Sequence, residues 1–167
     1  DGDKGQVVNL NVGRKIAEVA LPGMPHLGSG ITFEHQGRPV LATPHLKEGA
    51  VSVVDMKSWT TLKQIKTPGP GFFIPSPENT PYAWVDSFFG GPAKDTLQVI
   101  DKRTLEIVRT VTPAPGKTAA HVEFTRINIK ADYSNRPLRA LSSSVSLRRS
   151  ISIRRFSVAL AASKAAA

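Results

Sequence analysis

Short segments in which apolar and polar residues alternate recur along the chain up to residue 126. A period of two is typical of β-strands with one buried and one exposed face. The segment at 51–55 (VSVVD) returns at 97–101 (LQVID), and a weaker copy lies at 7–11 (VVNLN). The spacings of 44 and 46 residues between these copies fall in the range of repeat proteins such as β-propellers.

Each copy is followed by the same series of elements. A polar turn and a second alternating segment predict a β-hairpin, and a Pro-Gly pair and a third strand come next. The second segments are 15–19, 61–65 and 106–111, the Pro-Gly pairs begin at 22, 68 and 115, and the third strands end at Phe33, Ile74 and Phe124. In the first two copies a fourth strand follows, at 39–44 and 82–88. The pattern predicts an all-β fold, a partial β-propeller of about two and a half four-stranded blades.

The repeat stops after residue 126. Residues 127–167 are rich in Ser, Arg and Ala, and their eight Lys or Arg and one acid give a net charge of +7 out of the chain's +9. We therefore divide the chain into an incomplete propeller at 1–126 and a non-propeller basic tail at 127–167. A reading-frame slip or disorder explains the tail. The alternative is a basic arm for nucleic acid or lipid, but such an arm is not expected to begin within a blade, so nucleic acid is an unexpected partner.

The composition excludes several kinds of site. The chain has no cysteine, so it carries no disulfide, no thiolate metal site and no Cys-x-x-Cys-His attachment site for haem c. No apolar run approaches the roughly 20 residues that cross a bilayer. No signal peptide precedes Asp1, which we interpret as a cut end.

The candidate chemistry lies in histidines. His26 and His121 follow Pro-Gly pairs, where third strands begin, and His45 ends a fourth strand. Like ends of strands in neighbouring blades converge on one mouth of a propeller, so we expect these three side chains to share a pocket. Imidazole is the commonest metal ligand and exchanges protons near neutral pH. The alternative for each is a hydrogen-bonded loop residue, and we interpret His35, in a polar turn, as a surface residue.

Glycine and phenylalanine residues near these histidines favour a flat ligand. Gly28 and Gly30 let the backbone approach a bound group closely. Phe72 is placed to cover one side of such a ligand, although packing is the commoner role for a phenylalanine at a blade junction. The predicted cofactor-binding set is His26, Gly28, Gly30, His45, Phe72 and His121, and the predicted catalytic set is its three histidines.

Four segments carry a resemblance to a known family, namely 23–30 (GMPHLGSG), 42–45 (ATPH), 79–86 (NTPYAWVD) and 117–126 (KTAAHVEFTR). Over residues 1–126 the sequence resembles the haem d1-binding eight-bladed propeller of the cytochrome cd1 nitrite reductase family, with its haem d1 biosynthesis paralogues. The resemblance implies haem d1 as the cofactor, a periplasmic location and an oxidoreductase parent, of which this fragment alone is inactive.

The resemblance implies two activities. In the reductases, His26 and His45 would donate protons as nitrite becomes nitric oxide, with electrons from a donor protein; this step of denitrification is the first expectation. The alternative is a paralogue that dehydrogenates dihydro-haem d1, because a histidine at the place of His121 is more typical of those proteins. There His26 is the candidate iron ligand and His121 the candidate for proton transfer. A third reading is a non-enzymatic propeller that binds proteins, in which the three histidines point apart.

Overall fold

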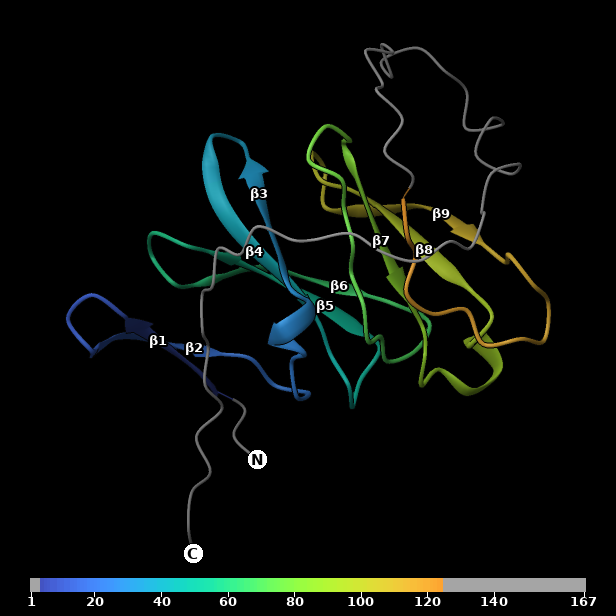
Figure 1. The fold of residues 1–167 in the computed structure, drawn as a ribbon, viewed down its shortest axis with the longest axis horizontal. Helices are drawn as coiled ribbons and strands as arrows, with labels where there is room; N and C mark the ends of the chain where they lie inside the picture. Colours follow the sequence, from blue (N-terminus) through green and yellow to red (C-terminus); the bar gives the residue numbers. More distant parts are fainter. Residues whose placement is uncertain (1–3, 125–167) are drawn as a thin grey trace, which may run out of the picture.

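The computed structural model describes residues 4–124, which form three antiparallel sheets in chain order (Figure 1). The predicted tail at 127–167 lies outside the described residues. The first sheet has two strands, the second four and the third three: β1 (Lys4–Asn9) and β2 (Arg14–Ala20); β3 (Ile31–His35), β4 (Arg38–Pro44), β5 (Ala50–Asp55) and β6 (Thr61–Lys66); β7 (Tyr82–Asp86), β8 (Leu97–Asp101) and β9 (Glu106–Val111). The all-β fold and the partial propeller are confirmed.

The complete sheet joins two sequence repeats. Its order β3-β4-β5-β6 combines the last two strands of the first copy with the hairpin of the second. The β3–β4 turn has positive φ at its two central residues, 51° at Gln36 and 74° at Gly37, as a tight hairpin matched to strand twist requires. Thus the predicted polar turn forms, but each blade begins in one repeat and ends in the next.

The hairpin turns of the three copies share one geometry. The Asp55 carboxylate accepts the N–H groups of Lys57 and Ser58 at 2.7 and 2.9 Å, and the Asp101 carboxylate accepts the N–H of Arg103 at 2.8 Å. Asn9 accepts the N–H of residue 11 in the same way, at 3.0 Å. Four residues after each of these side chains the backbone is left-handed, with φ between 57° and 60°, at Gly13, Trp59 and Leu105.

These turns correct the predicted alignment of the first copy. They equate Asn9 with Asp55 and Asp101, which makes both spacings 46 residues, whereas the sequence comparison gave 44 for the first. The comparison failed because it matched the apolar segments. The structural repeat is instead set by a side chain that accepts backbone N–H groups at the start of the turn.

The predicted third strands of the second and third copies do not form, because residues 67–81 and 112–124 are irregular. The carbonyls of Phe73 and Pro75 still accept the N–H groups of Asp86 and Trp84, at 3.3 and 3.0 Å. Proline has no N–H to donate, and residues 67–81 carry prolines at 68, 70, 75, 77 and 81. The chain therefore follows β7 as a third strand would, without completing its ladder.

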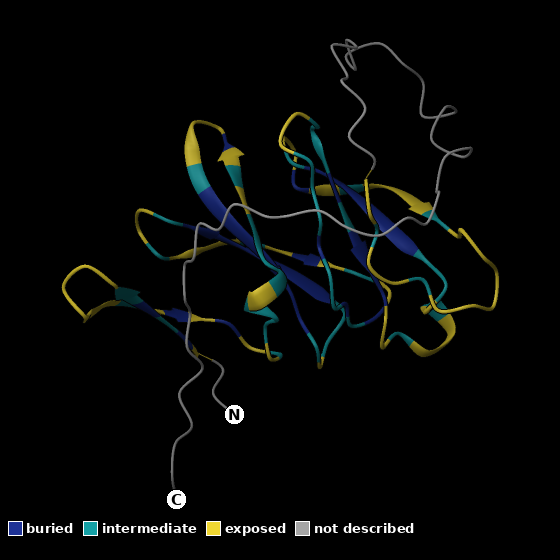
Figure 2. Cartoon of the chain, in the orientation of Figure 1, coloured by how far each residue is buried: buried dark blue, intermediate teal, exposed yellow. Residues whose placement is uncertain are grey.

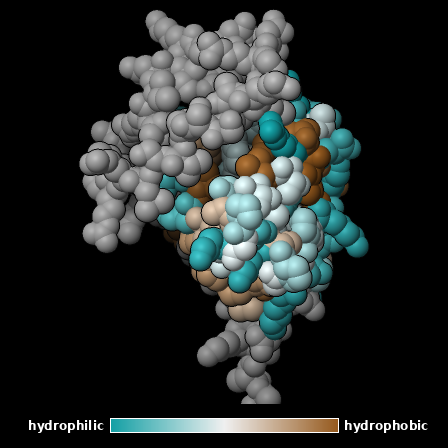
Figure 3. Space-filling model, turned by 90° about the vertical axis from the view of Figure 1, so that its right-hand side faces the viewer, coloured by the Kyte–Doolittle hydropathy of each residue, from teal (hydrophilic) through white to brown (hydrophobic). Residues whose placement is uncertain are grey.

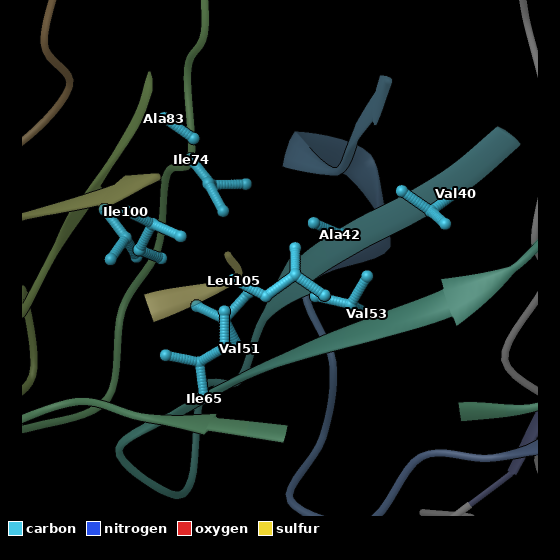
Figure 4. Close-up of a cluster of buried hydrophobic side chains, with 10 residues drawn as sticks. Val40, Ala42, Val51, Val53, Ile65, Ile74, Ala83, Ile100 and Leu105 are labelled. Atoms are coloured by element: carbon cyan, nitrogen blue, oxygen red, sulfur yellow. The ribbon is translucent and has the colours of Figure 1, made fainter. Parts of the chain in front are cut away.

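The larger core cluster lies between the second and third sheets, and a smaller one joins the first sheet to the second. β5 and β8 are buried along their whole length, and Figure 2 shows burial concentrated in these strands and in β4. Side chains from both sheets meet in one cluster (Figure 4), formed by Val40, Ala42, Val51, Val53, Ile65, Ile74, Ala83, Val85, Ile100 and Leu105. Burying apolar surface from two sheets at once fixes their relative position.

One side of the molecule is less well covered. Figure 3 looks onto the side toward which β9 lies in Figure 1, and it shows hydrophobic patches between hydrophilic residues. β9 is an edge strand of its sheet, and its Val108 is 44% exposed. A complete propeller covers such a side with the next blade.

We expect Ile74→Ala to destabilise the chain by about 2–5 kcal/mol, because the 1% exposed Ile74 side chain fills the contact between the two sheets. Ile16→Ala is the matched control, since Ile16 is 55% exposed on β2 and its loss costs no more than about 0.5 kcal/mol. Midpoints of chemical denaturation measure both. Equal midpoints for the two variants would show that Ile74 does not join the sheets.

Candidate functional site

A shallow pocket of about 350 Å³ lies where three connecting segments meet. The segments are the β2–β3 connection with its short 3-10 helix (Leu27–Ser29), the β6–β7 connection, and the chain after β9. Each of them leaves a sheet by its last strand. The pocket is lined by His26, Gly28, Ser29, Phe73, Ile74, Pro75 and His121.

His26 is fixed by backbone groups on two sides. Its own N–H donates to the carbonyl of Pro44 at 2.7 Å, and its ring Nδ1 lies 2.6 Å from the carbonyl oxygen of Phe72. A carbonyl only accepts, so Nδ1 carries the hydrogen and the ring lone pair is on Nε2. The Phe72 ring packs on the imidazole at a centroid distance of 4.1 Å. His26 is therefore an oriented imidazole whose Nε2 faces the pocket as a candidate ligand.

His121 reaches the same pocket from the segment after β9. Its ring stacks on the ring of Phe73 at 4.4 Å, with 29° between the planes, while His26 meets Phe73 edge-on at 6.2 Å. His121 is exposed and has a left-handed backbone, with φ of 53°. Such a conformation costs a non-glycine residue of order 1–3 kcal/mol. One phenylalanine ring thus contacts both histidines.

A buried carboxylate holds the segment between the two histidines. Asp86, 2% exposed at the end of β7, accepts the N–H of Phe72 at 2.7 Å and the N–H of Phe73 at 3.1 Å. It also accepts the N–H of Phe88 at 3.2 Å. The Phe72 carbonyl receives a second donor as well, the Ser29 hydroxyl at 2.7 Å. Both ends of the Phe72–Phe73 peptide group are therefore fixed.

His45 does not line the pocket, which corrects the prediction that three histidines share it. Its ring is fully buried: Nδ1 donates to the Glu48 carboxylate at 3.0 Å, and Nε2 accepts from the Ser52 hydroxyl at 2.9 Å. Burial lowers the pKa of His45, and the hydrogen bond to Glu48 opposes this shift. The His45 backbone bridges to Pro25, next to His26. Its position therefore supports the His26 segment.

The other predicted residues divide between pocket and scaffold. Gly28 lines the pocket, and nothing lies within 4 Å of the place where its Cβ would be. Gly30 faces β4 instead, because its Cβ would lie 3.2 Å from the carbonyl oxygen of Ala42. Phe72 contributes its carbonyl and packs behind His26. The interpretation of His35 as a surface residue is wrong: it is 8% exposed, and its Nδ1 donates to the carbonyl of Lys102 at 2.9 Å.

Three residues of the site were missing from the predicted set: Ser29, Phe73 and Asp86. Ser29 and Phe73 lie within the unusual loops that drew attention to His26 and Phe72, so proximity in sequence was a usable signal. Asp86 ends the segment 79–86 that carries the family resemblance, but an acid at the end of an apolar strand resembles the turn residues Asp55 and Asp101. Only the structure shows that it reaches back to Phe72.

Two kinds of feature are absent from residues 4–124. No group of three His, Asp or Glu side chains is arranged to hold a metal ion in this part of the chain. Neither of its short helices has the length and apolar character to cross a membrane.

Known proteins are similar to most of this chain. Residues 1–134 match the family described as the cytochrome D1 heme domain. The chain is 51% identical over 122 residues to dihydro-heme d1 dehydrogenase of Pseudomonas aeruginosa, which covers 73% of this chain and 24% of that protein. It is 32% identical over 113 residues to Protein NirF of the same organism, covering 68% and 27%. The chain spans about a quarter of the length of these curated relatives.

One solved structure supports the same family, and a second supports the fold. Dihydro-heme d1 dehydrogenase NirN in complex with DHE matches with a TM-score of 0.72 and 50% identity, over 75% of this chain and 27% of that one. Hydrazine synthase of Kuenenia stuttgartiensis matches with a TM-score of 0.53 and 23% identity, over 66% and 30%, which shows likeness of fold alone. The family predicted from the sequence is confirmed: with residues 1–134 matched, the chain belongs to the cytochrome D1 heme domain family.

Proposed function

We propose that this chain is the part of a haem d1 biosynthesis protein that holds dihydro-haem d1 during its dehydrogenation. One observation carries the proposal: His26 and His121 line the same pocket, on two sides of Phe73. A histidine at the place of His121 is the feature that the resemblance links to the biosynthetic paralogues. The 51% identity to dihydro-heme d1 dehydrogenase supports the same choice.

The residues present fit a tetrapyrrole iron. Histidine ligands to iron commonly donate their second ring N–H to a carbonyl or carboxylate, as His26 does to Phe72. The flat ring of Phe73 and the open space above Gly28 leave room for one edge of a macrocycle. His26 would therefore supply a ligand to the iron, and Phe73 would form an aromatic wall beside the tetrapyrrole.

The two histidines take different roles in this proposal. The tetrapyrrole, when bound, supplies the iron and the propionate side chain that loses hydrogen. The single bond between the two methylene carbons of this propionate becomes a double bond as two protons and two electrons leave. The electrons pass to an electron-acceptor protein. His26 orients the ligand through Nε2. His121, exposed and placed by Phe73, accepts one proton as a general base, and solvent takes the other.

Nitrite reduction has less support. It requires His45 to donate a proton in the pocket, yet both ring nitrogens of His45 are bonded inside the protein. The relatives that carry the dehydrogenase and NirF names also favour biosynthesis over reduction. A periplasmic location, and the division into a propeller at 1–126 and a separate tail, remain parts of our proposal that rest on resemblance and sequence.

The activity test uses the full-length protein that contains this segment. His26→Ala should weaken dihydro-haem d1 binding by more than about 10-fold, because the proposed iron ligand itself is lost and loss of an outer-shell partner alone costs about that much. His121→Ala should retain binding and slow dehydrogenation by about 10²–10⁴-fold, because a general base is lost. Absorption titration and single-turnover spectra measure the two effects.

His35→Ala is the matched control for both, since it removes an imidazole that does not line the pocket. Its binding and rate should equal those of the wild type. A protein that turns nitrite into nitric oxide and leaves dihydro-haem d1 unchanged would overturn the proposal in favour of the reductase reading.

Because His45 is buried, we expect the folded protein to lose stability in acid. Because its folded pKa is lowered from 6.5, the unfolded chain takes up the proton first as the pH falls. Its contribution to stability is fully present above pH 6.5 and is lost as the pH falls through the lower folded pKa. Denaturation midpoints measured against pH should show this fall for the wild type.

His45→Gln should remove that fall, leaving a flatter acid limb on the stability curve. Glu48→Gln should make the fall larger, since the Glu48 carboxylate opposes the lowering of the His45 pKa. An unchanged acid limb in His45→Gln would contradict the assignment.

A further inference from the structure

The peptide group whose carbonyl accepts the hydrogen bond from His26 also donates a hydrogen bond to a buried carboxylate. The carbonyl of that group belongs to Phe72 and lies 2.6 Å from His26 Nδ1. Its N–H belongs to Phe73 and donates to Asp86 Oδ2 at 3.1 Å. Asp86, the peptide group and His26 therefore form a continuous chain of two hydrogen bonds.

Such a chain changes the imidazole at its end. A carboxylate on the N–H side of an amide polarises the group and makes its carbonyl oxygen a stronger acceptor. A stronger acceptor at Nδ1–H favours the tautomer with its lone pair on Nε2 and makes Nε2 a better donor to a metal. In many metal sites a carboxylate bonds the ligating histidine directly. Here a peptide group stands between them.

We infer that Asp86 is a positioning residue for His26, acting through the Phe72–Phe73 peptide group to fix its Nδ1–H tautomer and strengthen Nε2 as an iron ligand. The part concerning iron rests on the proposed function. The part concerning the tautomer rests only on this structure.

Asp86 differs from the other buried aspartates of this kind. Asp55 and Asp101 accept N–H groups two or three residues along the chain and close their own turns. Asp86 accepts the N–H groups of Phe72 and Phe73, which are 14 and 13 residues away in another segment. Turn closure does not require that reach. Asp86 instead connects the end of β7 to the pocket.

Ser29 provides an independent test of the same chain. Its hydroxyl lies 2.7 Å from the Phe72 carbonyl that His26 uses and 3.1 Å from the carbonyl of His26 itself. At the Phe72 oxygen it competes with the ring N–H of His26. Removing the hydroxyl strengthens the His26 bond, whereas removing the Asp86 charge weakens it. Two variants therefore act in opposite directions on one atom.

The first experiment needs no haem. Nitrogen-15 NMR of histidine-labelled, haem-free full-length protein reports which ring nitrogen of His26 carries hydrogen. The wild type and Ser29→Ala should show the Nδ1–H tautomer, and Asp86→Asn a mixture of both. Asp55→Asn is the matched control, a buried aspartate that accepts two N–H groups away from the pocket, and should resemble the wild type. A pure Nδ1–H tautomer in a folded Asp86→Asn protein would overturn the inference.

The second experiment uses haem d1 as the probe. Asp86→Asn should weaken ferric haem d1 binding by about tenfold and raise its midpoint potential, because a weaker ligand favours the ferric state less. Ser29→Ala should lower the potential, and this variant keeps the inference testable should Asp86→Asn fail to fold. Equal potentials in Ser29→Ala and the wild type would overturn it. A ferric spectrum that His26→Ala leaves unchanged would instead refute the proposed ligand and leave the tautomer result standing.

Discussion

The packing of the second sheet against the third holds in place the segments that form most of the pocket. Because β5 and β8 are buried along their whole length, neither sheet can shift without exposing apolar surface. The connections at the ends of these sheets are brought close enough that side chains do not fit between them. A Cβ on Gly69 would lie 2.2 Å from the Cα of Gly90, so glycine is required there. The pocket is made of segments held in place by this contact.

The site combines a rigid half with an accessible one. His26 is held by the Pro44 and Phe72 carbonyls and by a ring contact, while the backbone of His45 bridges to the preceding Pro25. His121 contacts the pocket through one stacked ring and is exposed to solvent. An axial ligand gains from fixed geometry, and a group that exchanges protons with water needs access to it. The difference in fixation therefore matches the two proposed roles.

The sequence was sufficient for the fold and for part of the site. Recurring apolar segments predicted most of the strands, although β5 and β8 are buried on both faces and do not have one exposed face. Like places in the repeat predicted that His26 and His121 share a mouth of the propeller. Prediction from the sequence failed where hydrogen bonds of side chains determine the structure. The turn at Asn9 set the repeat register against the apolar match, and the prolines around Phe73 prevented a regular strand. His45 followed the strand-end pattern, but its ring turns inward to Ser52, a direction that no spacing encodes.

Asp86 shows why contacts between segments that are distant in sequence are the hardest to predict. Within one hairpin an aspartate and the N–H groups it accepts are neighbours in sequence, so the turn can be recognised from the residues. Asp86 instead accepts N–H groups from the segment that precedes its strand, and that segment is brought back only because β7 packs into the core. Burial then makes the pairing obligatory, since an unpaired carboxylate at that depth costs more than the bonds it replaces. The core thus determines the hydrogen bond on which the orientation of His26 depends.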